Sequence, residues 1–324
     1  MPRRTRTNLP NVRTASSEVR VLCVSDLHLS DKAPASRTDD WWATMEEVLV
    51  WLHDLAGNDT VLCAGDVFDE PYRNRARPSH LLWNLCHTYF PKYFICVPGQ
   101  HDLPGQTMDN LGETGLWGLA MAGRANIAYE KTTHLNGITV FGLPWGVDWP
   151  TEPPPDHPTL GLAHRMVWKG KSPYPGAPVR GKAESVCGEA ARMGLHVIVT
   201  GDNHMRFEHV AKNGVTLLNP GSLFQTTAAQ VAHLPGAYDL TLDGKTSEVL
   251  RYNFIPAPCA GPDRISRQHI EQREEKEGRL AAMVEGLEAG AVLGLSFDEN
   301  IKQALEQTRL RRSVRAKILE CLEV

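Results

Sequence analysis

The feature that most constrains the fold is a set of polar residues placed directly after apolar, strand-like runs. The five groups are Asp26 with His28, then Asp66, then Gln100 with His101 and Asp102, then His164, and finally Asp202 with Asn203 and His204. In α/β proteins ligands bind at the carboxyl edge of the sheet, where residues that follow strands converge. The pattern therefore predicts a sheet protein with one polar site at that edge.

Strands and helices alternate through the first two thirds of the chain. Expected strands cover 19–24, 60–64, 92–97, 138–142, 159–163 and 195–200, and expected helices cover 41–55, 78–90 and 182–193. Two hairpins follow, with turns at Asn213-Gly214 and Asp243-Gly244. The alternation predicts an α/β fold with helices on the faces of the sheet, and the late hairpins indicate a mixed sheet in two packed layers.

The chain is expected to have three segments. Residues 1–18 carry Arg3, Arg4, Arg6 and Arg13 before the first acidic residue, which favours a flexible basic tail over a phosphate-binding arm or a transit peptide. Residues 19–258 form the α/β domain. Beyond the proline-rich stretch 256–262 the sequence becomes helical and charged, so 259–324 form a helical C-terminal region, in which 296–299 fit a capping box.

Composition restricts the cellular setting and the binding partners. A net charge of -4 excludes coating of nucleic acid through global positive charge, although a local basic patch stays open. No apolar run of about 18 residues is present, so no membrane span is expected. The seven cysteines are odd in number and lie mostly within apolar runs, which is typical of reduced, buried thiols in a cytoplasmic protein. The oligomeric state stays open.

The five polar groups favour a metal site when they are taken together. Singly, each has an ordinary explanation, because an aspartate after a strand often caps the next helix. Together, they would repel or desolvate one another at one edge without a cation between them. Carboxylate, imidazole and amide ligands suit Mn²⁺, Fe²⁺ or Zn²⁺ better than Ca²⁺. A carboxylate shared by two ions about 3.5–4 Å apart would complete a hydrolytic two-metal site.

The order of these residues resembles the calcineurin-like metallophosphoesterase superfamily. The motifs stand here as Asp26-Leu-His28, Gly65-Asp66, Gly99-Gln-His-Asp102, His164 and Gly201-Asp-Asn-His204, followed by the closing turn Asn219-Pro-Gly-Ser222. The resemblance implies a two-layered mixed β-sandwich flanked by helices, with the catalytic domain in 19–258 and the C-terminal helices as an appendix. It also implies two divalent metal ions, with Mn²⁺ expected first and Mg²⁺, Fe²⁺ or Zn²⁺ as alternatives.

The resemblance also implies a role for each residue. One metal would be held by Asp26, His28, Asp66 and His204, and the other by Asp66, Gln100, His164 and Asp202, with Asp66 as the bridge. His101 would contact the phosphate and protonate the leaving group, while Asp102 orients its ring. A metal-activated water would attack the phosphorus.

Two positions depart from the family pattern, and both belong to the second metal. Gln100 stands where asparagine is usual, and Asp202 stands where the first histidine of Gly-His-x-His is usual. Both side chains can still ligate through oxygen. An aspartate in place of a neutral imidazole should favour a harder ion such as Mn²⁺ or Mg²⁺.

Within the superfamily, the chain is most similar to DNA nuclease subunits of the SbcD type. The similarity rests on Ser25-Asp-Leu-His-Leu-Ser30 and Gly65-Asp-Val-Phe-Asp69. It implies a DNA substrate, and an SbcC-like coiled-coil ATPase that docks on the C-terminal helices. Those helices carry a basic stripe, which is either a nucleic-acid contact or a solvated face: Arg309, Arg311, Arg312, Arg315 and Lys317.

Two other functions stay open at this point. One is a phosphatase or phosphodiesterase that acts on a small-molecule or protein phosphoester, and the other is a non-catalytic interaction module. A module should have lost Asp66 or His101, and neither is lost. Four tryptophans near the expected site loops could stack bases, or could cover the edge of the core: Trp41, Trp42, Trp145 and Trp149.

Overall fold

A computed structural model describes residues 18–72, 77–129, 132–155, 159–171, 179–259, 264–268, 275–282, 284–285, 297–308 and 310–322. The chain divides into two compact units, 1–265 and 266–324, and each is described by itself. The expected basic tail lies outside the described residues, apart from Glu18, which opens the first strand. Among the described helices, none is long and apolar enough to cross a membrane.

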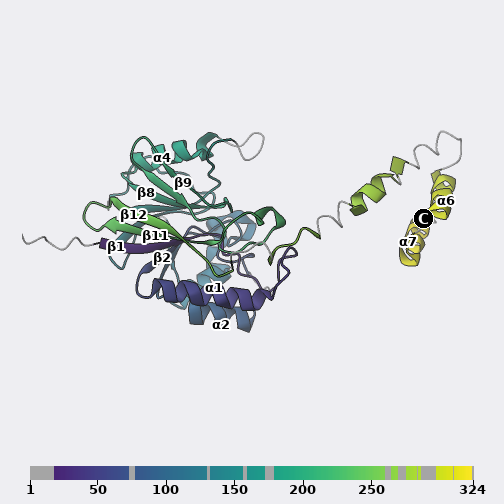
Figure 1. Ribbon diagram of the computed structural model, residues 1–324, viewed down its shortest axis with the longest axis horizontal. Helices are drawn as coiled ribbons and strands as arrows, with labels where there is room; N and C mark the ends of the chain where they lie inside the picture. Colours follow the sequence, from purple (N-terminus) through teal and green to yellow (C-terminus); the bar gives the residue numbers. More distant parts are fainter. Residues whose placement is uncertain are drawn as a thin grey trace, which may run out of the picture. The chain divides into compact units, whose positions relative to one another are not determined.

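The first unit contains two six-stranded mixed sheets, as the late hairpins predicted (Figure 1). In the first sheet, β1 (Glu18–Val24), β2 (Thr60–Cys63), β3 (Tyr93–Cys96) and β4 (Asn126–Ile127) are parallel, and β11 (Gly236–Asp243) and β12 (Val249–Pro256) are antiparallel additions beside β1. Its strand order is β12-β11-β1-β2-β3-β4.

The second sheet has the order β5-β6-β7-β8-β10-β9. Four strands are parallel, namely β6 (Ile138–Leu143), β7 (Leu160–His164), β8 (Val197–Gly201) and β10 (Thr216–Asn219). The edge strand β5 (Thr132–Leu135) pairs antiparallel with β6, and the edge strand β9 (Phe207–Val210) pairs antiparallel with β10. The two hairpins lie as expected, the first joining β9 to β10 and the second joining β11 to β12.

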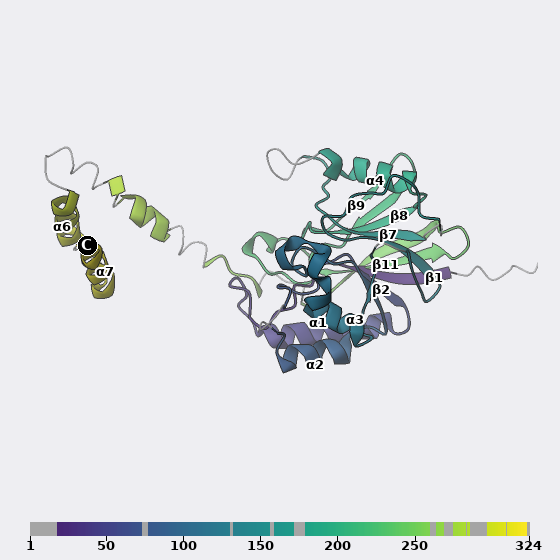
Figure 2. The ribbon, with the colours of Figure 1, turned by 180° about the vertical axis from the view of Figure 1, so that it is seen from behind.

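Three apolar cores hold these layers together. The core between the sheets includes Val21 and Leu62 from the first sheet and Leu162 and Val199 from the second. Helices α1 (Trp41–Ala56), α2 (His80–Tyr89) and α3 (Gly115–Met121) cover the outer face of the first sheet, and α4 (Ala183–Arg192) covers the second (Figure 2). The fold is therefore a β-sandwich flanked by helices, as the sequence implied.

Helix caps and short helical turns complete the unit. The Asp40 side chain accepts a hydrogen bond from the backbone amide of Ala43 and so caps α1, and Ser79 caps α2. Within the described residues, four 3₁₀ helices link the main elements: η1 (Pro104–Gln106), η2 (Met108–Glu113), η3 (Val179–Gly181) and η4 (Ala228–Gln230). These turns, together with α3, β4 and β5, were not expected from the sequence, because they are short, and β4 and β5 lack the clear apolar run that marks β2 and β3.

The second unit contains α6 (Phe297–Gln307) and α7 (Arg312–Leu322). Ile301 and Leu305 of α6 are buried. Of the expected basic stripe, Arg311, Arg312, Arg315 and Lys317 are exposed. Arg309 and the expected capping residue Ser296 lie outside the described residues.

Candidate metal centre

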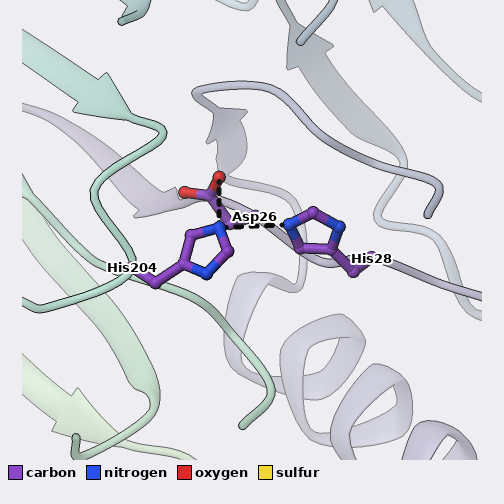
Figure 3. A group of neighbouring side chains, drawn as sticks. All are labelled: Asp26, His28 and His204. Carbon is purple, nitrogen blue, oxygen red and sulfur yellow. Dashed lines mark hydrogen bonds and ion pairs between the residues drawn. The ribbon is translucent and has the colours of Figure 1, made fainter. Parts of the chain in front are cut away.

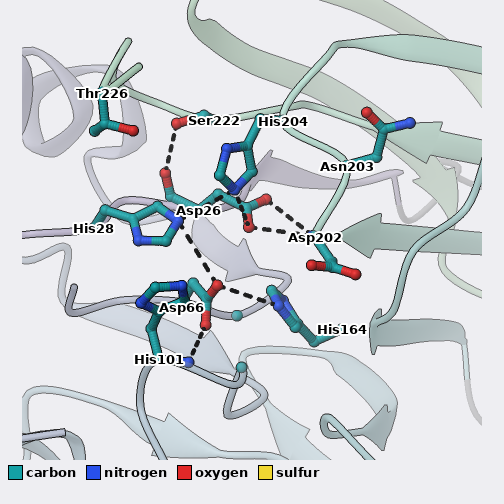
Figure 4. A network of polar contacts seen from close by, with 12 residues as sticks. Asp26, His28, Asp66, His101, His164, Asp202, Asn203, His204, Ser222 and Thr226 are labelled. Atoms are coloured by element: carbon teal, nitrogen blue, oxygen red, sulfur yellow. Dashed lines mark hydrogen bonds and ion pairs between the residues drawn. The ribbon is translucent and has the colours of Figure 1, made fainter. Parts of the chain in front are cut away.

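The site is built from five loops that leave the carboxyl ends of β1, β2, β3, β7 and β8. Four of its residues adopt left-handed backbone conformations, with φ of 50° at Asp26, 46° at His28, 49° at Asp66 and 72° at Asp202. Non-glycine residues rarely adopt positive φ, and clusters of such strain are typical of functional sites. The strained turns aim these side chains into one space between the two sheets (Figure 4).

Three glycines allow the loops to approach one another. A Cβ atom added to Gly65 would lie 2.2 Å from the His164 ring, one added to Gly99 would lie 2.1 Å from Asp66 Oδ1, and one added to Gly201 would lie 2.2 Å from Ser25 Oγ. Each glycine directly precedes a polar group of the site. The glycines in these motifs are therefore needed because only a hydrogen fits at their α-carbons.

One part of the site joins Asp26, His28 and His204 (Figure 3). His204 Nε2 lies 3.6 Å from Asp26 Oδ1 and 3.3 Å from His28 Nε2. Asp26 is fully buried and His28 is almost so. Two imidazole nitrogens and a carboxylate oxygen, brought together from the loops after β1 and β8, match the donor set of a divalent transition metal.

Asp66 lies between this group and a second one (Figure 4). Its Oδ2 atom is 3.7 Å from His28 Nε2 and 3.4 Å from His164 Nε2. Its Oδ1 atom accepts a hydrogen bond from the backbone amide of His101, at 2.9 Å. Oδ2, in contrast, is buried and has no hydrogen-bond partner among the described residues. An unsatisfied buried carboxylate oxygen is costly, and a cation on either side of it would remove that cost.

The second group contains Gln100, His164 and Asp202. Gln100 donates to Asp202 Oδ1 at 2.8 Å through its amide nitrogen, and its Oε1 lies 2.6 Å from His164 Nε2. His164 Nδ1 lies 2.5 Å from the carbonyl oxygen of Ala64, so that nitrogen donates and Nε2 remains directed at the site. The structure thus brings all seven expected metal ligands together, including both residues that depart from the family pattern.

This arrangement fits two metal ions. Two overlapping groups, Asp26 with His28 and His204, and Asp26 with Asp66 and His164, each place three ligand atoms within 4.8 Å of one another. Asp66 Oδ2, which accepts no hydrogen bond from the described residues, faces histidines of both groups. The donors are oxygen and imidazole nitrogen, with no thiolate, which suits Mn²⁺, Mg²⁺, Fe²⁺ or Zn²⁺. The ligand assignments themselves stay predictions.

The carboxylates of the site and its burial shift the pKa values of its histidines. Burial is the largest influence on His164 and opposes its charged form, but the carboxylates of Asp66, Asp26 and Asp202 together outweigh it and raise the pKa of that imidazole. Burial lowers the pKa of His204, against the attraction of Asp26. A metal requires neutral imidazoles, so an ion that binds beside His164 must displace a proton.

His101 lies at the open side of the site. Its side chain is 43% exposed, and its ring lies 4.7 Å from the His28 ring, centroid to centroid. His101 Nδ1 lies 2.8 Å from the carbonyl oxygen of Asp69, which can only accept, so Nδ1 donates. The Nε2 atom is therefore the one left to meet a substrate.

Asp102 was expected to orient the His101 ring, but in the structure its carboxylate bonds to backbone amides instead. Its carboxylate is buried and accepts hydrogen bonds from the backbone amides of Val67, Phe68 and Gly99. Burial and the charge of Asp66 raise the pKa of Asp102 to about 6, against those three donors. Asp102 therefore ties the loop after β2 to the loop after β3, and so positions Asp66. The sequence could not show this role, because the Asp102 side chain can turn either toward the His101 ring or toward the backbone amides of a neighbouring loop.

Asp69 orients two histidines of the site, and the sequence interpretation gave it no such role. Its Oδ1 atom lies 3.2 Å from His28 Nδ1, and its carbonyl oxygen accepts from His101. The hydrogen bond to His28 holds the pKa of Asp69 below its usual range. A carboxylate behind a histidine fixes which ring nitrogen is free to bind metal. The sequence feature that points to Asp69 is its place in the motif Gly65-Asp-Val-Phe-Asp69, which indicates the resemblance to SbcD-type nucleases but no role for this residue.

Similar proteins of known structure share little sequence with this chain. TT1561 of Thermus thermophilus is 14% identical, with 74% of this chain and 99% of that chain covered and a TM-score of 0.44. Vacuolar Protein Sorting 29 from Cryptosporidium parvum is 17% identical, with 74% and 98% covered and a TM-score of 0.36. A 5'-nucleotidase precursor from Thermus thermophilus is 14% identical, with 82% and 59% covered and a TM-score of 0.41. No curated protein sequence matches the chain.

A family model matches much more directly. The model described as calcineurin-like phosphoesterase matches residues 19–206, which are more than half of the chain. The matched range contains β2 to β8, all of β1 except Glu18, and every residue of the site described above. The chain therefore belongs to the calcineurin-like phosphoesterase family.

Proposed function

We propose that the protein is a two-metal phosphodiesterase that cleaves DNA, as a nuclease of the SbcD type. The observation that carries the hydrolytic part is the buried Asp66 Oδ2, which lies between His28 and His164 and has no hydrogen-bond partner among the described residues. Two divalent ions bound there would polarise a phosphoryl oxygen and supply an activated water. The family match supports hydrolysis of phosphoric esters in general.

The chain's own residues would position the substrate and move one proton. His101 Nδ1 is held by the Asp69 carbonyl, so Nε2 is the nitrogen that would face the leaving group. A doubly protonated His101 would give its Nε2 proton to the departing oxygen and stay anchored through Nδ1. Asp69 fixes both His28 and His101, so a single residue links metal ligation to proton delivery.

A long polymer substrate is supported by the exposure of one side of the site. The His101 side chain is 43% exposed and that of Asp69 is 52% exposed, whereas Asp26 and Asp66 are fully buried. The leaving-group side thus faces solvent, and a strand can continue past it. The motif Gly65-Asp-Val-Phe-Asp69 adds the resemblance to SbcD-type nucleases. The coiled-coil ATPase partner stays a prediction.

Hydrolysis of labelled linear DNA and of bis(p-nitrophenyl) phosphate tests the proposal. Each substrate is incubated with the full chain and Mn²⁺, Mg²⁺, Zn²⁺ or chelator, beside Asp66→Asn and the control Asp54→Asn on the exposed face of α1. We expect metal-dependent cleavage of DNA that is lost in Asp66→Asn and kept in Asp54→Asn. Cleavage of the chromogenic ester alone would remove DNA as the substrate and favour a small-molecule or protein phosphoester. Cleavage of neither would favour a non-catalytic module.

A further inference from the structure

A pocket opens beside the metal centre. It has a volume of about 340 Å³, and its walls include Trp145, His164, Arg165, Trp168 and Arg180. His164 is shared with the metal centre, and the Trp145 ring lies 6.2 Å from the His164 ring, centroid to centroid. The backbone amide of Trp145 donates to the carbonyl of Pro98, directly before Gly99. A molecule in this pocket would therefore lie next to a phosphoryl group at the metals.

The aromatic walls of the pocket are held in place by the backbone. Trp168 is buried, with 6% of its surface exposed, and its backbone exchanges hydrogen bonds with Gly181 and Ala183. A Cβ atom at Gly181 would lie 2.2 Å from the Trp168 ring, so the ring packs directly on that glycine. Trp145 is only partly buried. One indole is thus a fixed wall, and the other offers part of its surface to a planar ligand.

The pocket also carries cations that are only partly neutralised. Arg165 donates through Nη2 to the carbonyl of Val147 and lies over the Trp149 ring, while its Nε is buried without a hydrogen-bond partner. Within the described part of the chain, no carboxylate lies within 4.0 Å of the Arg165 guanidinium. Arg180 pairs with Asp148 at 3.5 Å, but both side chains are more than three quarters exposed, so that pair is weak.

We propose that this pocket is a nucleotide subsite, in which a base of the bound strand stacks on Trp145 and an adjacent phosphate pairs with Arg165 and Arg180. The inference rests on the proposed function and specifies its substrate contact. An aromatic surface beside two arginines matches a ligand that has both a planar base and an anion. Stacking accepts any base, so the subsite would select nucleic acid over simple esters without reading sequence.

The test measures binding, independently of cleavage. Fluorescent tetrathymidylates, intact or with one abasic nucleotide at each position in turn, are titrated into the Ca²⁺-loaded full chain, and anisotropy gives Kd while a gel checks that the strand is uncut. In the unmodified protein, one abasic position should weaken binding about 10-fold, the order expected for one stacked base. Trp145→Leu should abolish that difference, Trp145→Phe should keep most of it, and the control Trp117→Leu on α3 should keep all of it.

The arginine has a different signature, which separates stacking from charge. Arg165→Gln should weaken the intact and abasic strands by the same factor, whereas the control Arg251→Gln on β12 should change neither. The subsite would be overturned if the unmodified protein bound intact and abasic strands equally well, or if Trp145→Leu kept the same difference between them. Normal binding by Arg165→Gln would overturn it as well. If no ion supports DNA hydrolysis but the Trp145-dependent preference persists, the nuclease proposal fails and the subsite stands.

Discussion

Replacing Gly99 by alanine tests whether close contact between loops builds the metal centre. The added Cβ atom would lie 2.1 Å from Asp66 Oδ1 and 2.5 Å from the Asp66 backbone nitrogen, whereas ordinary contact begins at 3.4 Å. A gap of about 1.3 Å must therefore open at the carboxylate. The backbone amide of Gly99 also donates to Asp102, so the loop cannot retreat without losing that hydrogen bond.

The expected effect is large on metal binding and moderate on stability. Metal–ligand distances tolerate only about 0.2 Å, so a carboxylate displaced by several times that amount should bind poorly. We expect the affinity for Mn²⁺ to fall by at least about 10–100-fold, comparable to the loss of an outer-shell partner. Overpacking of a buried position costs about 1–3 kcal/mol in the free energy of unfolding.

The assay combines calorimetric titration with Mn²⁺ and thermal unfolding with and without the ion. Gly188→Ala is the matched control, because it lies on the exposed face of α4 and nothing lies within 4 Å of its added Cβ. Alanine has the higher helix propensity, by about 1 kcal/mol, so this control should be neutral or slightly stabilising. A Gly99→Ala protein with unchanged Mn²⁺ affinity would refute the reasoning that Gly99 must be a glycine for Asp66 to take its position.

Three further predictions concern the residues around the metals. His101→Ala should lower kcat for hydrolysis by about 10²–10⁴-fold with metal content unchanged, and retained activity would remove its proton-transfer role. Asp69→Asn should weaken metal binding by about 10–100-fold in a titration, whereas its exposed neighbour Glu70→Gln should not; equal behaviour would contradict the role of Asp69 behind His28. Because the surrounding carboxylates, Asp66 first among them, raise the pKa of buried His164 to about 10, protons compete with the metal, so calorimetry should show Mn²⁺ affinity that keeps rising as the pH increases toward that value. An affinity independent of pH would show that no proton is displaced.

The sequence predicted the layers of the fold well, because the longer strands and helices have clear apolar periodicity. The expected strand 19–24 is β1 (Glu18–Val24), and the expected helix 41–55 is α1 (Trp41–Ala56). The convergence of Asp26, Asp66 and His204 was also predicted. Asp26 and Asp66 follow parallel strands of one sheet and so meet at its edge, and His204 joins them from the second sheet. The two-residue strand β4 was not predicted, because a periodic pattern cannot be recognised in two residues.

The sequence showed which residues belong to the site more readily than which of them contact one another. Asp102 and Asp69 both lie near His101, and only the path of the loops decides which one holds the ring. The left-handed conformation of Asp66 turns its backbone so that Val67 and Phe68 present their amides to Asp102. Such a turn depends on tertiary contacts with the loop after β3, and residue type alone does not show it.

The central claim is a centre of two metal ions bridged by Asp66, and counting the bound metal tests it most directly. The full chain is loaded with Mn²⁺, freed of excess ion by gel filtration and analysed by inductively coupled plasma mass spectrometry, beside Asp66→Asn and Asp54→Asn. We predict two ions per chain for the unmodified protein and for Asp54→Asn, and fewer than one for Asp66→Asn. Two ions retained in Asp66→Asn, or none bound by the unmodified protein, would contradict the bridged centre.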